Sequence, residues 1–166
     1  ESSFRALQEF AIPGTDIQRW SKDSDRDYDF KAPEAYRPNS AAMISTHDMT
    51  SFNAWWEYEA GTVYAPLFER ACQSRNVDFE RIKPELFDLA QSFHERLRWK
   101  EDIREEDLIR VLGKPREEIL DLIDFYQYSF NEKKRFWHYL NLPENCEEKS
   151  SPKLLAAALE KISQTN

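Results

Sequence analysis

The sequence predicts a mainly α-helical fold with one or two short β-strands near the N-terminus. After residue 50, apolar residues recur at three- and four-residue steps, a spacing typical of amphipathic helices. One apolar run, Ala41–Ile44, is bounded by polar residues and suits a buried strand, although periodicity alone also allows a helix. The chain contains only 3 glycines among 166 residues. An intact barrel with many tight turns needs more glycine, so we expect helices joined by short linkers.

The first 50 residues are predicted to hold one helix, a second strand and a loop besides the strand just described. Apolar side chains three positions apart indicate a helix over residues 3–10. A second strand is expected over residues 15–20, with Ile17 facing inward and Arg19 on the opposite face. The segment 21–29 is dense in Asp and Ser and is predicted to be an exposed loop.

Every element predicted after residue 50 is a helix. Thr50 or Ser51 is a suitable N-cap for a helix that ends at Gly61. Pro84 suits the first turn of a strong helix, because apolar residues follow it at helical steps. The further predicted helices cover residues 66–74, 84–97, 105–112, 115–140 and 152–162.

Bulk properties exclude several classes of function. The formal net charge is −8, which disfavours a nucleic-acid partner because phosphate binding draws on clustered Lys and Arg. The longest apolar run, Leu154–Leu159, is too short to cross a membrane, and the first residues lack the pattern of a signal peptide. Cys72 and Cys146 are expected to be free thiols in a reducing cytoplasm. No cluster of His, Cys or carboxylates has metal-binding spacing, so no metal is expected.

The candidate site follows the apolar run directly, as Ser45-Thr46-His47-Asp48. A histidine and a carboxylate at the exit of a buried strand are where an α/β barrel places its catalytic groups. On residue types alone, a hydrogen-bonded loop histidine and a capping or loop carboxylate are the more common roles for His47 and Asp48.

Four motifs, in this order, resemble the C-terminal part of a 4-α-glucanotransferase of glycoside hydrolase family 77, the amylomaltases or disproportionating enzymes. These motifs are Ile12-Pro13-Gly14, Gln18-Arg19-Trp20, Thr46-His47-Asp48 and Trp55-Trp56. The resemblance is good over residues 1–60 and thinner afterwards. It implies a fragment of a (β/α)₈ TIM-barrel enzyme, with a late-barrel segment over 1–60 and a helical subdomain over 61–166, unless the two form one continuous domain.

The resemblance also implies roles for individual residues. The family moves α-1,4-glucan segments between maltooligosaccharides by a retaining mechanism, without an organic cofactor. Asp48 would stabilise the positive charge of the transition state, and His47 would hydrogen-bond a sugar hydroxyl. Arg19 and Trp55 are further substrate-binding candidates. For Trp55 and its neighbour Trp56, a place in the core is the more common arrangement.

The nucleophile and the acid/base of the family lie upstream of the resembling segment. We therefore expect the isolated chain to be inactive, and to self-associate through apolar surface that the rest of a barrel would cover. The alternative is a non-catalytic helical interaction module in which His47-Asp48 is incidental. Side chains converging on a cavity at a strand end favour the enzyme, and a solvent-facing cap favours the module.

Overall fold

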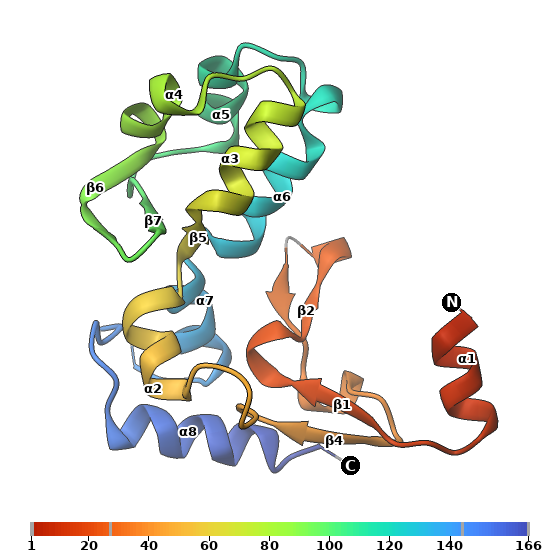
Figure 1. Cartoon of the computed structure of the whole chain (residues 1–166). Helices are drawn as coiled ribbons and strands as arrows, with labels where there is room; N and C mark the ends of the chain where they lie inside the picture. Colours follow the sequence, from red (N-terminus) through yellow and green to blue (C-terminus); the bar gives the residue numbers. More distant parts are fainter. Residues whose placement is uncertain (1, 27, 144, 166) are drawn as a thin grey trace. The chain divides into compact units, whose positions relative to one another are not determined.

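The computed structural model describes residues 2–26, 28–143 and 145–165 (Figure 1). These residues form two compact units. The first extends to Glu57 and resumes at Lys134, and the second covers Tyr58–Lys133. The polypeptide passes between them through a π-helical turn, Trp55–Glu59, and through helix α7, Glu132–Tyr139. The predicted division into residues 1–60 and 61–166 stays a prediction.

The first unit contains two small sheets and three further α-helices. Strand β1 (Gly14–Ile17) pairs in parallel with β4 (Ser40–Met43), so that their carboxyl ends lie at the same edge. Strands β2 (Lys22–Asp23) and β3 (Asp29–Phe30) form a short antiparallel ladder. The helices are α1 (Ser2–Glu9), α2 (Phe52–Ala54) and α8 (Pro152–Ile162), and 3₁₀ turns cover Gln18–Trp20, Ser24–Arg26 and Pro33–Ala35.

An aromatic cluster forms the core of this unit. Trp55 and Phe136 meet edge to face with ring centroids 5.2 Å apart, and Trp56 lies 6.2 Å from Phe136. Trp56 and Phe136 have no exposed surface, so burial of these rings is a main source of stability. The buried Gln18 amide donates to the carbonyl of Ala158, 3.1 Å away, which ties the 3₁₀ turn after β1 to α8.

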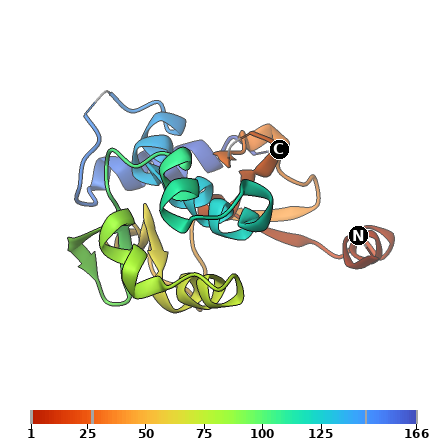
Figure 2. The same cartoon turned by 90° about the horizontal axis from the view of Figure 1, so that it is seen from above.

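The second unit packs helices against a three-stranded antiparallel sheet of order β5-β7-β6. The β6–β7 hairpin projects from the helices in both views (Figure 1 and Figure 2). The core of the second unit includes Phe68, Phe87 and Trp99, which are at most 4% exposed. The elements are β5 (Thr62–Tyr64), α3 (Ala65–Ser74), α4 (Phe79–Leu86), β6 (Phe87–Phe93), β7 (Arg96–Trp99), α5 (Glu105–Leu112), a 3₁₀ turn at Arg116–Glu118 and α6 (Leu120–Ser129).

Several helix predictions are confirmed. Helix α5 has the predicted bounds and ends at Gly113, whose φ of +65° is the left-handed conformation of a helix C-cap. The Ser51 hydroxyl accepts a hydrogen bond from the Ala54 amide and caps α2, and Ser151 caps α8 in the same way. The helix predicted over 115–140 is interrupted, because Asn131 adopts a positive φ of 53° between α6 and α7.

The helix predicted over 84–97 is wrong, and with it the prediction that everything after residue 60 is helical. Pro84 lies inside α4, which ends at Leu86, and the chain then forms the β6–β7 hairpin. Of the apolar residues that suggest this helix, Leu89 and Phe93 lie exposed in β6, and Leu97 is buried in β7. Tertiary packing therefore overrides the apparent helical spacing.

The strand predictions near the N-terminus are partly wrong. The strand expected over 15–20 ends at Ile17, and Arg19 is buried like Ile17 instead of facing the opposite way. The predicted buried strand is β4, but none of its four residues is buried and Ala41 is exposed, because a two-stranded sheet leaves much of its surface uncovered. The predicted loop 21–29 contains the β2–β3 ladder, with Lys22 buried over the Phe30 ring.

The fold is therefore a mixture of helices and small sheets, with more strands than predicted. In the described residues the strands form open sheets of two, two and three strands and no closed barrel. Across the same residues, no helix combines the length and apolar character needed to cross a membrane.

Candidate functional site

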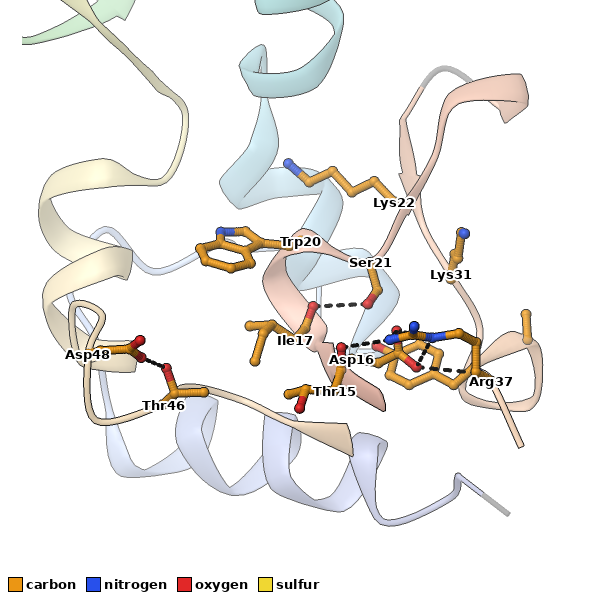
Figure 3. A pocket seen from close by; sticks show the side chains of 12 residues that line it. Thr15, Asp16, Ile17, Trp20, Ser21, Lys22, Lys31, Arg37, Thr46 and Asp48 are labelled. Atoms are coloured by element: carbon orange, nitrogen blue, oxygen red, sulfur yellow. Dashed lines mark hydrogen bonds and ion pairs between the residues drawn. The ribbon is translucent and has the colours of Figure 1, made fainter. Parts of the chain in front are cut away.

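A cavity of about 600 Å³ lies in the first unit beside the parallel β1–β4 pair (Figure 3). Both strands lead into it at their carboxyl ends: Ile17 and Trp20 follow from β1, and Thr46 and Asp48 follow β4. Carboxyl ends of neighbouring parallel strands are where α/β folds place ligand sites, because the strands fix residues that the loops expose.

Asp48 lies in an exposed turn on one side of this cavity. The Thr46 hydroxyl donates a hydrogen bond to its Oδ1 atom, which orients the carboxylate (Figure 3). His47 is exposed in the same turn, but in the described first unit the cavity lining contains its two neighbours and not His47. The structure thus brings one residue of the predicted His-Asp pair to the cavity.

Trp20 gives the cavity an aromatic surface. Its indole is 60% exposed and lines the cavity together with Ile17 and Asp48 (Figure 3). The preceding residue, Arg19, is only 2% exposed, because the 3₁₀ turn sends the two side chains in different directions. An exposed indole beside a carboxylate offers an apolar face and a hydrogen-bond acceptor to one ligand.

The opposite side of the cavity is built on an ion pair. Arg37 Nη2 donates to Asp16 Oδ1 at 2.8 Å and to the Thr15 carbonyl at 2.8 Å. Partial burial alone would raise the pKa of Asp16. Hydrogen bonds from Arg37 and Ser40 and the positive charge of Arg37 outweigh that effect, and the pKa is lowered below its usual value. This side of the cavity therefore carries an ionised carboxylate, Asp16, that already accepts hydrogen bonds from Arg37 and Ser40.

Tyr36 lines the cavity, although its hydroxyl oxygen is buried. Burial raises its pKa far above the usual value, and the nearby Tyr139 raises it further. Tyr36 is therefore protonated at any physiological pH. Among the described residues no group of His, Cys, Asp and Glu side chains is arranged to hold a metal ion.

The structure places the other two predicted substrate contacts in the interior. Trp55 is 4% exposed and packs against Phe52 and Phe136. The Arg19 guanidinium lies 5.6 Å from the centre of the Trp55 ring and donates from Nη2 to the Thr50 carbonyl at 2.9 Å. Roles for Arg19 and Trp55 at the substrate stay predictions, as do those of His47 and Asp48.

Sequence reasoning missed Asp16, Tyr36 and Arg37 as parts of the cavity. Asp16 and Arg37 are 21 positions apart, so no local pattern links them. One signal was available. Ligand sites in α/β folds lie at the carboxyl ends of parallel strands, so a second strand parallel to β4 implies that residues around both strands line the same cavity.

Comparisons with known proteins identify the family of this chain. The 4-alpha-glucanotransferase family matches residues 2–166. The 4-alpha-glucanotransferases of Chlamydia trachomatis and Chlamydia muridarum are each 34% identical over 53 residues, which are 32% of this chain and 10% of theirs. The aligned stretch thus spans about a tenth of the length of these curated relatives. No solved structure matches the chain. Because the family match covers nearly the whole sequence, this chain belongs to the 4-alpha-glucanotransferase family.

Proposed function

We propose that this chain is a late segment of a 4-α-glucanotransferase and contributes Asp48 and His47 to its active site. The observation that carries the proposal is the position of Asp48 in a cavity at the carboxyl ends of two parallel strands. A parallel pair joined by a long crossover is also what a fragment of a (β/α)₈ barrel contains. The proposed reaction moves α-1,4-glucan segments between maltooligosaccharides with retention of configuration.

Asp48 acts by electrostatic stabilisation in this proposal. Retaining transfer uses a nucleophile and an acid/base with carboxyl groups about 5 to 5.5 Å apart, and the sugar ring becomes cationic in the transition state. A fixed third carboxylate opposes that charge as it develops, so it lowers the barrier more than it tightens ground-state binding. His47, exposed in the same turn, donates to a hydroxyl of the same sugar.

The cavity suits a neutral sugar. Its volume of about 600 Å³ lies within the range of small-ligand sites, roughly 300–1,000 Å³. Trp20 offers a flat apolar face to the axial hydrogens of a pyranose, and Asp48 offers a carboxylate to its hydroxyl groups. The cytoplasmic location, the lack of an organic cofactor and self-association of the chain stay predictions of the sequence.

The decisive test measures transfer between maltooligosaccharides by the full-length enzyme that contains this chain. We expect Asp48→Asn to lower kcat by about a hundredfold or more, in line with loss of one preorganised electrostatic contact. Asp29→Asn is the matched control, because Asp29 is an exposed carboxylate of the same unit outside the cavity. An unchanged rate in Asp48→Asn would show that Asp48 is structural.

The chain of 166 residues alone is expected to be inactive on maltotriose, because the two carboxyl groups of covalent catalysis come from elsewhere in the enzyme. General acid/base catalysis alone contributes about 10² to 10⁴ in rate. Detectable disproportionation of maltotriose by the purified chain would overturn this part of the proposal. Two results together would favour the non-catalytic interaction module. The 166-residue chain would bind no maltooligosaccharide, and Asp48→Asn would leave the activity of the full-length enzyme unchanged.

A further inference from the structure

Arg19 is a buried cation next to the cavity. It is 2% exposed, although its neighbour Trp20 in the same 3₁₀ turn is 60% exposed. Burying a guanidinium is costly unless hydrogen bonds and neighbouring rings compensate. Its Nη2 atom donates to the Thr50 carbonyl at 2.9 Å and reaches the Thr50 hydroxyl at 3.4 Å, and its Cζ lies 5.6 Å from the centre of the Trp55 ring.

The Thr50 carbonyl is also the point where the His47-Asp48 turn closes. The Ser45 hydroxyl donates to the same carbonyl at 3.0 Å, so residues 45 and 50 are joined across the base of the turn. The next residue, Ser51, begins helix α2 as its N-cap. One carbonyl therefore receives hydrogen bonds from the strand side of the turn and from the buried Arg19.

This arrangement ties the turn that carries Asp48 to a buried residue. The Asp48 side chain accepts a hydrogen bond from Thr46, which belongs to the same turn and moves with it. The link from the turn to a buried element runs through Thr50 to Arg19. A misplacement of about 1 Å at a catalytic group can cost about a hundredfold in rate, so a fixed turn base matters for catalysis.

We propose that Arg19 is a positioning residue for Asp48, holding the base of the His47-Asp48 turn, in place of the direct substrate contact predicted from sequence. The inference rests on the proposed function, in which Asp48 stabilises the transition state. Arg19 is suited to the task because its planar guanidinium is always charged and offers several donors in a rigid plane.

The test uses Arg19→Met and Arg19→Lys in the full-length enzyme that contains this chain, with Arg26→Met as control. Arg26 is an exposed arginine of the same unit outside the cavity. We expect Arg19→Met to lower kcat by about ten- to a hundredfold with KM changed less than about threefold, and Arg19→Lys to recover part of the loss. A rise in KM at constant kcat would overturn the proposal in favour of direct substrate contact.

A double-variant cycle separates positioning from a general loss of structure. In an Asp48→Asn background, Arg19→Met should cause little further loss, because the group that it positions is already gone. An equal further loss would overturn the proposal. Ser45→Ala removes the other hydrogen bond to the Thr50 carbonyl without removing a buried charge. It should lower kcat in the same direction even if Arg19→Met folds poorly.

A readout without catalysis distinguishes failure of this inference from failure of the proposed function. In the 166-residue chain, hydrogen exchange of the Ala54 and Trp55 amides, which donate to Ser51 beside Thr50, should become faster in Arg19→Met and stay unchanged in Arg26→Met. If Asp48→Asn leaves transfer unaffected while exchange behaves as expected, the proposed function fails and the positioning contact stands. Unchanged exchange in Arg19→Met would overturn the positioning role itself.

Discussion

Arg37 and Asp16 join the two strands that lead into the cavity. Arg37 donates from Nε to both carboxylate oxygens of Asp16, at 3.1 Å each, and from Nη2 to Oδ1 at 2.8 Å. Ser40, the first residue of β4, donates to Asp16 Oδ2 at 2.5 Å. Asp16 itself lies in β1 opposite Ala42. The carboxylate therefore fixes the register of the parallel pair whose far ends carry Trp20 and Asp48.

The Asp16 contacts predict a pH-dependent stability. We expect Asp16→Asn to lower the unfolding free energy near neutral pH by about 1 to 2 kcal/mol, with the partial exposure of Arg37 limiting the effect. Although burial opposes ionisation, hydrogen bonds from Arg37 and Ser40 and the charge of Arg37 lower the pKa of Asp16 below 3.8. The contribution is therefore present above that value and is lost as pH falls through the lowered pKa.

Urea unfolding at several pH values checks this prediction. The difference in unfolding free energy between the wild type and Asp16→Asn should be constant from about pH 7 to 5 and shrink as pH falls toward 3. Asp29→Asn, at an exposed carboxylate of the same unit, is the control and should show a small difference. A difference that persists undiminished at about pH 3 would contradict the assigned cause.

Gly14 is predicted to be required because the Arg37 side chain passes over it. A Cβ atom at this position would lie 2.9 Å from both Cζ and Nη1 of Arg37. Gly14→Ala should therefore displace the guanidinium from Asp16 and lower the unfolding free energy by about 1 kcal/mol or more. In an Arg37→Met background the same change should be neutral or stabilising by up to about 1 kcal/mol, since alanine restricts the unfolded chain. Equal effects in both backgrounds, measured by thermal unfolding, would contradict the prediction.

Local signals in the sequence predicted α5, α8 and the start of α2. The acidic first turn of α5 and its closing Gly113 are both visible as residue types, and so are the Ser-Pro start of α8 and the Ser51 cap of α2. The β6–β7 hairpin was missed because its turn carries His94 and Glu95, where turns of this kind usually have Asn-Gly. Pro84 suggests the start of a helix, but it lies two residues before the end of α4.

The sequence predicted where the candidate site lies along the chain, but not which residues contact one another there. The exit of β4 could be predicted because an apolar run followed by Thr46-His47-Asp48 marks a strand end. The parallel pairing with β1 is a long-range contact, and the Asp16–Arg37 pair depends on it. The interior positions of Arg19 and Trp55 depend on a 3₁₀ turn and an aromatic cluster that no local spacing reveals.

The hairpin turn stores backbone strain that can be removed. His94 and Glu95 have φ values of 47° and 61°, a region that favours Gly and Asn over these residues. We expect the double variant His94→Asn with Glu95→Gly to raise the unfolding free energy by about 1 kcal/mol. Loss of the weak hydrogen bond from the Tyr64 hydroxyl to the Glu95 carboxylate will reduce this gain. Thermal or urea unfolding measures the change.

Gly113→Ala provides the opposite control for the hairpin variant. Gly113 has a φ of +65°, and a methyl group added to its Cα would meet no atom within 4 Å, so alanine adds backbone strain without a clash. It should lower the unfolding free energy by about 1 kcal/mol. If the hairpin variant also loses stability, the His94 and Glu95 side chains stabilise the turn by more than their backbone strain destabilises it.

Trp20 allows ligand binding to be followed in the chain itself. It is 60% exposed, whereas the other four tryptophans are at most 4% exposed, so an aqueous quencher such as acrylamide should act mainly on Trp20. Trp20→Phe should remove most of the quenchable fluorescence and its red-shifted part. On the proposed function, a long maltooligosaccharide should reduce quenching of Trp20 in the wild type, because a bound sugar covers the indole. Asp48→Asn should retain part of this protection, since that variant keeps the aromatic face. Quenching that is unaffected by saturating sugar would show that the cavity beside Trp20 is not a sugar site in this chain.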